Sequence, residues 1–184
     1  MPFSGGMDSA VLLRMAQYNH AELHALTFDY GQRHVREIEC AKRQIEHARL
    51  FSFTRNYGKN VIIHKIIDVR FLKDIVPTSS LTNDDIATPN VNDMVGEAQP
   101  ASYVPYRNQL FLTIACAYAE SINANTIYHG ATAVDSLAGY WDGSVEFNDK
   151  FNNLIKLNRK GVITMKCPLL KFDKQQIVKF GVEH

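Results

Sequence analysis

This chain has little cysteine, little tryptophan and almost no net charge: three cysteines, one tryptophan and a charge of +1 in 184 residues. Cys40, Cys116 and Cys167 form no C-x-x-C pair, which argues against a disulfide framework and fits a reducing compartment. The near-zero charge gives no electrostatic reason to expect a nucleic-acid or membrane partner. The sequence also lacks a signal-peptide pattern and any apolar run of the roughly 20 residues that cross a bilayer. We therefore expect a soluble, cytoplasmic protein.

The spacing of apolar residues predicts strands that alternate with helices. An apolar content of 46% and a charged content of 21% are ordinary globular values, and the length suits one domain over residues 1–184. Helices are predicted over residues 8–19, 33–50, 106–122, 146–158 and 173–181, and strands over 22–28, 61–68, 126–129 and 162–166. Such alternation is typical of an α/β fold with a parallel sheet, which binds ligands beyond the carboxyl ends of its strands.

Two polar intervals and two short ends complete this outline. Residues 77–102 are polar and without period, and residues 130–145 are expected to form a loop. Only Met1 to Phe3 precede the first motif, and the chain stops directly after the last predicted helix. From these ends we expect that part of the natural protein is missing.

The most informative motif lies at the start of the chain and reads Phe3-Ser4-Gly5-Gly6-Met7-Asp8-Ser9. Two glycines let the backbone approach an anion, and the first N–H groups of the following helix point at it. Ser4 and Ser9 can donate hydroxyl hydrogen bonds, whereas Asp8 beside a phosphate needs a metal ion or backbone N–H groups. We therefore predict a Mg-nucleotide site that lacks the lysine of the Walker pattern. The alternative is an ordinary glycine-rich turn with Asp8 or Ser9 as the helix cap.

Two further polar strings are expected at the same end of the sheet. Phe28-Asp29-Tyr30-Gly31-Gln32-Arg33-His34 closes the strand predicted over 22–28, where Arg33 could reach a phosphate or a carboxylate. Tyr103-Val104-Pro105-Tyr106-Arg107-Asn108 opens the next predicted helix, and a cation in a first helical turn generally has an anion to meet. The alternatives are a solvated helix start for the first string and a plain helix start for the second.

A third polar segment follows the strand predicted over 126–129. Asp135, Tyr140, Trp141 and Asp142 could hold a flat heterocycle by stacking and edge hydrogen bonds, or the loop could pack its own aromatic rings. No histidine or cysteine cluster has the spacing of metal ligands. The histidines outside the motifs are interpreted as surface or hydrogen-bonded core residues: His20, His24, His47, His64 and His129.

Taken together, these strings resemble the 7-cyano-7-deazaguanine synthase family of the QueC type, which belongs to the PP-loop ATP pyrophosphatases. The match also includes Gly139-Tyr140-x-Asp142, Glu146-Phe147 and Cys167-Pro-Leu-Leu170, and it runs in order over essentially the whole chain. The resemblance implies a Rossmann-like PP-loop fold, a three-layer sandwich around a parallel sheet. It also implies a cytoplasmic ATP-dependent C–N ligase of queuosine biosynthesis and tRNA modification, in a family whose members are often homodimers.

The resemblance implies a reaction and assigns the residues to it. Mg-ATP adenylates the carboxylate of 7-carboxy-7-deazaguanine, ammonia displaces AMP to give an amide, and a second ATP activates the amide oxygen to leave the nitrile. ATP binding is expected from Phe3, Ser4, Gly5, Gly6, Asp8, Ser9, Phe28 and Asp29. Charge stabilisation is expected from Asp8, Arg33, Arg107 and Asn108, and binding of the deazapurine from Tyr30, Gln32, His34, Tyr103, Asp135, Tyr140 and Asp142.

Two departures from the family pattern bear on the substrate and on metal ions. The loop over residues 135–144 is one residue longer, with Trp141 in place of proline and Gly143 in place of cysteine. The zinc-binding cysteines of the family's tail are not in this chain, so no metal ligand is assigned beyond a Mg²⁺ held by phosphates and Asp8. Two alternatives stay open: a PP-loop enzyme that adenylates a different carboxylate, and a nucleotide-binding relative without catalysis.

Overall fold

The computed structural model describes residues 1–31, 36–54, 60–79, 103–137, 140–158 and 160–183, which form helices and strands in alternation. Their order is α1 (Met7–Asn19), β1 (Glu22–Asp29), α2 (Arg36–Thr54), β2 (Val61–Asp68), α3 (Leu72–Ile75), α4 (Arg107–Ser121), β3 (Thr126–Tyr128), α5 (Ala133–Leu137), the 3₁₀ helix η2 (Trp141–Gly143), α6 (Val145–Ile155), β4 (Thr164–Lys166) and α7 (Lys174–Glu183). The strands pair in parallel, which confirms the predicted α/β class.

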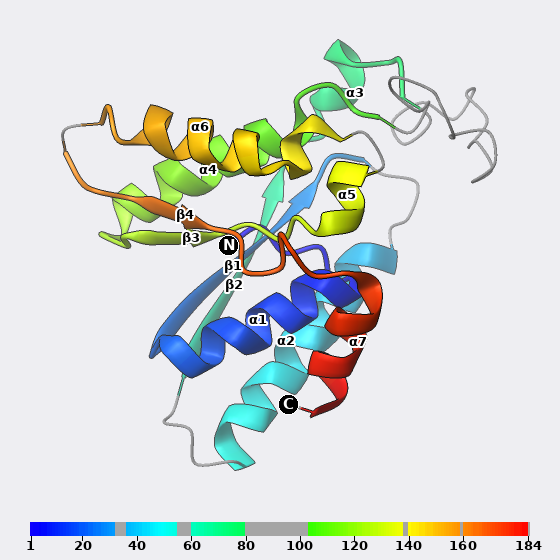
Figure 1. Cartoon of the computed structure of the whole chain (residues 1–184), viewed down its shortest axis with the longest axis vertical. Coiled ribbons are helices and arrows are strands. Elements are labelled where there is room, and N and C mark those ends of the chain that lie inside the picture. Colours follow the sequence, from blue (N-terminus) through cyan, green and yellow to red (C-terminus); the bar gives the residue numbers. More distant parts are fainter. Residues whose placement is uncertain (32–35, 55–59, 80–102, 138–139, 159, 184) are drawn as a thin grey trace.

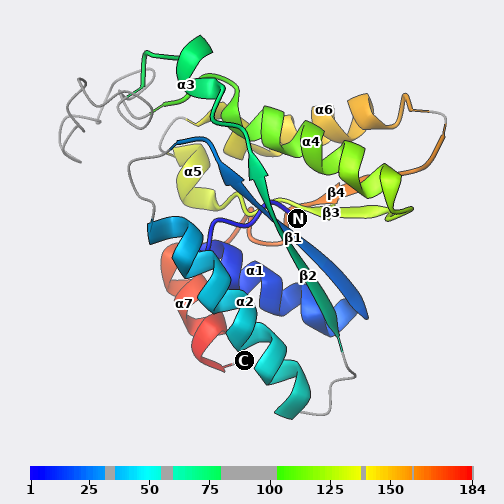
Figure 2. The same cartoon turned by 180° about the vertical axis from the view of Figure 1, so that it is seen from behind.

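The strand β1 is central because both of its edges are hydrogen-bonded. One edge pairs with β2 along the whole strand. On the other edge, Leu26 N–H donates to the Met1 carbonyl and Phe3 N–H donates to the Leu26 carbonyl, each at 2.8 Å. The strands β3 and β4 form a second parallel pair, and the amino terminus lies between the two pairs in both views (Figures 1 and 2). The predicted sheet is thus present as two parallel pairs.

Helices cover both faces of the strands (Figure 1). Leu23 and Ala25 of β1 belong to one buried cluster with α1, α2 and α7. Leu26 and Phe28 belong to a second cluster with α4 and α6. Side chains alternate across a strand, so residues two apart share a face, and β1 contributes apolar side chains to both clusters. Among the described residues, no helix has the length and apolarity needed to cross a membrane.

The interval 130–145 is not the plain loop that the sequence predicted. It contains α5 and η2. The Asp135 carboxylate accepts from the Thr132 N–H at 2.7 Å and from the Thr132 hydroxyl at 2.9 Å, which ties the turn before α5 to its first turn. The short helix α3 was not predicted either, while most of the polar interval 77–102 falls outside the described residues.

Three predicted helix ends were also wrong. α2 continues to Thr54 rather than ending at residue 50. α6 ends at Ile155 rather than at residue 158, because its final residues close tighter turns from Leu157 to Leu154 and from Asn158 to Ile155. α7 continues through Gly181 to Glu183. A Cβ at Gly181 would lie 3.1 Å from the side chain of Val11, so this glycine allows α7 to approach α1 instead of ending the helix.

Gly5 occupies the tightest position of the loop that leads into α1. Its φ is +78°, a region that L side chains rarely adopt, and an added Cβ would lie 2.3 Å from the Ala41 backbone nitrogen. The obstacle is the backbone of α2, which cannot move as a side chain can. Gly6 has an ordinary φ of −75°, and an added Cβ would meet only the Ser4 hydroxyl at 3.3 Å.

We therefore expect Gly5→Ala to lower the free energy of unfolding by about 3 kcal/mol, the sum of left-handed strain and overpacking. Gly6→Ala, the matched control, should cost less than about 1 kcal/mol because its new methyl group meets a side chain that can rotate. Chemical denaturation of the two variants measures the difference. Equal stabilities would show that α2 does not press against the loop as described.

Candidate active site

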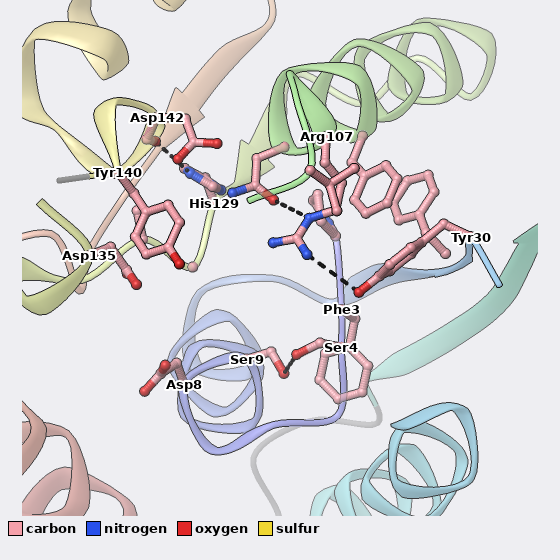
Figure 3. A pocket seen from close by; sticks show the side chains of 18 of the residues that line it. Phe3, Ser4, Asp8, Ser9, Tyr30, Arg107, His129, Asp135, Tyr140 and Asp142 are labelled. Carbon is pink, nitrogen blue, oxygen red and sulfur yellow. Dashed lines mark hydrogen bonds between the residues drawn. The ribbon is translucent and has the colours of Figure 1, made fainter. Parts of the chain in front are cut away.

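A cavity of about 440 Å³ opens at the carboxyl ends of β1 and β3 (Figure 3). Its walls come mainly from four segments that are distant in the sequence: the loop into α1, the end of β1, the start of α4, and the described residues between His129 and Gly143. Glu37 of α2 lines it as well. The four segments are those whose polar residues the sequence placed at one end of the sheet. Parallel strands bring their carboxyl ends to the same edge, which explains why the segments meet.

Most of the predicted site residues line this cavity. They are Phe3, Ser4, Asp8, Ser9, Phe28, Tyr30, Tyr103, Arg107, Asn108, Asp135, Tyr140 and Asp142. Gly5, Gly6 and Asp29 do not line it, and the Asp29 carboxylate instead accepts from the Gly31 N–H at 3.0 Å. Gln32, Arg33 and His34 lie outside the described residues. The structure thus gathers these residues, while their roles stay predictions.

The loop into α1 presents an uncapped helix start to the cavity. Gly6 is the N-cap residue, and it has no side chain that could accept from the first-turn N–H groups. Ser4 Oγ accepts from the Gly6 N–H at 3.2 Å, and Ser9 Oγ donates to the Gly6 carbonyl at 2.9 Å. The two hydroxyl oxygens lie 3.3 Å apart. An anion at this end of α1 would meet unpaired N–H donors, two hydroxyls and the positive end of the helix dipole.

Asp8 has a partner that the sequence analysis missed. Lys174 Nζ, at the first position of α7, donates to Asp8 Oδ2 at 2.6 Å. The other carboxylate oxygen, Oδ1, is buried and has no hydrogen-bond partner in the described structure. The expectation that only a metal ion or backbone N–H groups could balance Asp8 was therefore incomplete, because a lysine does so.

Arg107 projects into the cavity from the first turn of α4 and faces the end of β1. Its guanidinium donates to the Tyr30 hydroxyl and to Asn108 Oδ1, each at 3.3 Å, and lies 5.5 Å from the centre of the Tyr30 ring. Burial raises the pKa of Tyr30, so this phenol stays neutral at physiological pH. Because both acceptors are neutral, these hydrogen bonds orient the guanidinium toward the cavity without neutralising its charge.

Asp142 and His129 are buried residues of the opposite wall. His129 Nε2–H donates to the Asp142 backbone carbonyl at 3.3 Å. Burial raises the pKa of the Asp142 carboxyl, although a hydrogen bond from the Asn108 side chain opposes that shift. Burial lowers the pKa of His129, which therefore stays neutral. Among the lining residues that the structure describes, Arg107 is then the one cation, and Asp142 is near enough to it for an electrostatic interaction.

Trp141 does not take part in the cavity wall, unlike Tyr140. Its indole N–H donates to the Tyr103 hydroxyl at 3.0 Å, and its ring packs edge-on against Phe147 at 5.3 Å and Tyr106 at 5.5 Å. Trp141 thus packs against aromatic rings of other segments, Tyr103 and Tyr106 before α4 and Phe147 in α6, which neither interpretation of the loop predicted. Its contacts fix Tyr103, which does line the cavity.

Several lining residues were not predicted as site residues: Pro2, Thr27, Glu37, Val104, Phe111, His129, Gly130, Ala131 and Gly143. The sequence indicated only a surface or core position for His129. His129 lies directly after β3, at the carboxyl end of a parallel strand, and this position could have indicated that it belongs to the site. Glu37 follows Arg33 by one helical turn, but nothing in its spacing indicated that it would face the cavity.

Comparison with known proteins agrees with these motifs. A family model described as "Queuosine biosynthesis protein QueC" matches residues 1–184. The chain belongs to the QueC family. It is 40% identical over 185 residues to a 7-cyano-7-deazaguanine synthase of Picrophilus torridus, a match that covers 97% of this chain and 70% of that protein.

Two further QueC relatives come from bacteria. The chain is 38% identical to the 7-cyano-7-deazaguanine synthase of Oceanobacillus iheyensis, over 98% of this chain and 76% of that protein. It is 36% identical to 7-cyano-7-deazaguanine synthase 1 of Colwellia psychrerythraea, with the same two coverages. The resemblance drawn from the motifs is thus confirmed at the level of the family.

The buried neutral His129 gives the stability of this chain a pH dependence with a defined sign. Because the pKa of His129 is lowered in the folded state, the unfolded chain binds a proton that the folded chain excludes. Stability should therefore fall as the pH drops below the ordinary value of 6.5. The slope from one such group is at most about 1.4 kcal/mol per pH unit.

We expect His129→Gln to reduce the loss of stability between about pH 7 and pH 5, measured by chemical denaturation at each pH. His47→Gln is the control, since His47 is exposed on α2. A His129→Gln variant that keeps the full wild-type pH slope would contradict the burial of a neutral imidazole at this position.

Proposed function

We propose that this chain is an ATP-dependent ligase that makes 7-cyano-7-deazaguanine from 7-carboxy-7-deazaguanine and ammonia. The names of its relatives support the product, and membership of the QueC family supports a place in queuosine biosynthesis. The observation that carries the proposal is the shared cavity. One wall offers an anion site at the start of α1, and another offers Arg107, while Asp135 and Asp142 face them from beyond β3.

In this proposal the start of α1 binds the phosphates of ATP. Ser4 and Ser9 supply hydroxyl donors beside the first-turn N–H groups, and the open Gly6 cap leaves those groups available. Phe28 stacks on Phe111 at 4.1 Å with the rings nearly parallel, and both line the cavity. This pair provides an apolar wall beside the phosphate site, suited to the adenine ring.

The carboxylate of the acid substrate would then meet Arg107. A guanidinium matches a carboxylate in shape and charge, and here its hydrogen bonds to Tyr30 and Asn108 hold it in place. The deazaguanine ring presents N–H donors along one edge, and carboxylates are the acceptors that match such donors. Asp142 and Asp135 lie on the wall that faces this edge, with the Tyr140 ring beside them.

The chemistry needs positioning and charge stabilisation rather than a protein nucleophile. A carboxylate oxygen attacks the α-phosphorus of ATP, and pyrophosphate leaves. Ammonia attacks the resulting acyl carbon, and AMP leaves to give the amide. The amide oxygen attacks a second α-phosphorus, again releasing pyrophosphate. AMP then departs with that oxygen as the nitrogen loses its two protons, which leaves the nitrile.

Asp8 is the carboxylate that fits a Mg²⁺ ion brought by ATP. Magnesium in nucleotide sites takes one or two carboxylates plus phosphate oxygens and waters, and Asp8, whose Oδ1 lacks a hydrogen-bond partner, would be the carboxylate that holds it. Bound there, the ion would neutralise charge on the phosphates. In the described part of the chain, no three His, Cys, Asp or Glu side chains gather to hold a metal, so no step is assigned to zinc.

Two coarser features complete the proposal. We place the two strand pairs and their covering helices in the PP-loop fold of three layers, which the family membership supports. We also propose that the protein is a homodimer. Sedimentation of the purified protein would measure the mass of the assembly. Neither feature alters the chemistry assigned to the cavity.

Arg107 gives the sharpest test of the assigned roles. We expect Arg107→Ala to lower the rate of AMP formation with 7-carboxy-7-deazaguanine by on the order of 10²-fold or more, because the anion loses its charged partner. Arg70→Ala is the control, since Arg70 is exposed and pairs with Asp68 away from the cavity. AMP release is measured for both variants at saturating ATP.

A near-normal rate in Arg107→Ala would remove this residue from the mechanism. Wild-type protein that forms AMP with another acid, but none with 7-carboxy-7-deazaguanine, would favour a PP-loop ligase of different specificity. The longer 135–144 segment is the feature that would then explain the change. Binding of ATP without AMP formation for any acid would favour the non-catalytic alternative.

A further inference from the structure

Lys174 stands where a cation is electrostatically unfavourable. It is the first residue of α7, beside the positive end of the helix dipole. The residue before it, Asp173, forms a reciprocal cap: its carboxylate accepts from the Gln176 N–H at 2.8 Å, and its own N–H donates to the Gln176 side chain at 2.9 Å. This cap fixes where α7 begins and therefore where Lys174 lies.

The lysine has a compensating partner across the fold. Its Nζ donates to Asp8 Oδ2 at 2.6 Å, although the two residues are 166 positions apart. α7 is held against α1 by the fully buried Ile177 and by the close approach of Gly181 to Val11. The ion pair thus joins two helices whose relative position is set by packing rather than by the pair itself.

Asp8 leaves α1 on a different side from Ser9, whose hydroxyl faces Ser4 (Figure 3). The Asp8 carboxylate nevertheless lies in the first turn of α1 and lines the same cavity as the two serines. An uncompensated carboxylate there would repel any phosphate drawn to the start of α1. Lys174 does not line the cavity, so it acts on the phosphate site through Asp8.

We propose that Lys174 is a positioning residue for ATP: it neutralises Asp8 Oδ2 beside the phosphate site and fixes the orientation of this carboxylate, whose other oxygen, Oδ1, is buried without a hydrogen-bond partner. The inference rests on the proposed function, because it needs a nucleotide at the start of α1. The motif at residues 3–9 includes no residue of α7, and the proposal adds one residue of that helix to the nucleotide site.

The ion pair contributes little to stability, so an effect of Lys174 on ATP binding can be measured separately from an effect on folding. The Lys174 side chain is 45% exposed and that of Asp8 is 29% exposed, and ion pairs in such settings stabilise proteins only slightly. Loss of the lysine should therefore leave the melting temperature nearly unchanged while it weakens the binding of ATP.

The test is a double-mutant cycle on the full chain, with the Kd of Mg-ATP measured by calorimetry. We expect Lys174→Met to raise the Kd about tenfold, as one unbalanced charge near the phosphates would. In an Asp8→Asn background the same lysine change should alter the Kd by less than about twofold, since no charge is left to balance. Lys174→Arg should restore near-normal binding.

Lys179→Met is the matched control, because Lys179 is exposed on the same helix and pairs only loosely with Glu183 at 3.9 Å. A tenfold loss in both backgrounds would mean that Lys174 contacts the phosphates directly, which overturns the positioning role. A lower melting temperature with an unchanged Kd would overturn it as well, since the pair would then be structural. Wild-type protein that binds no ATP would instead overturn the proposed function, and this inference with it.

Discussion

The close approach of α2 to the loop at residues 4–6 is the constraint on which the rest of the site depends. Gly5 has no Cβ because the Ala41 backbone occupies that space, and its positive φ turns the chain sharply from the 1–3 segment into α1. The turn leaves the start of α1 uncapped and facing the carboxyl end of β1. Gly5 thus has two structural consequences: it lets the loop backbone approach a phosphate, and it lets α2 pack closely against the loop.

At the start of α1 and at Arg107, charge is arranged so that an anion can bind, although Glu37, Asp135 and Asp142 also line the cavity. Arg107 is held by neutral partners, Tyr30 and Asn108, and His129 is kept neutral by burial. The carboxylate closest to the phosphate loop, Asp8, is balanced by Lys174 from outside the cavity. Two anionic substrates that must react with each other need such an environment, because each would otherwise repel the other as well as the protein.

The family, the α/β class and most of the cavity wall could be predicted from the sequence, because these features depend on local strings and on the rule for parallel strands. That rule alone places four segments with unusual polar residues at one end of the sheet. The short helix α5 was missed although Thr132 and Asp135, three residues apart, form a local pair at its start that resembles a capping pattern. The single 3₁₀ turn η2 is too short for any apolar period to indicate. The ion pair of Asp8 with Lys174 joins residues too distant for any local pattern to indicate. Gly181 had the appearance of a helix end and proved to be a packing contact against Val11.

The central claim is that this cavity turns a deazapurine carboxylic acid into a nitrile at the expense of ATP. Mass spectrometry of the products tests it most directly, after incubation of the protein with Mg-ATP, ammonium and 7-carboxy-7-deazaguanine. The account predicts 7-cyano-7-deazaguanine together with AMP and pyrophosphate, with the amide as an intermediate at early times. An unchanged acid and intact ATP, from folded protein that binds the nucleotide, would contradict it.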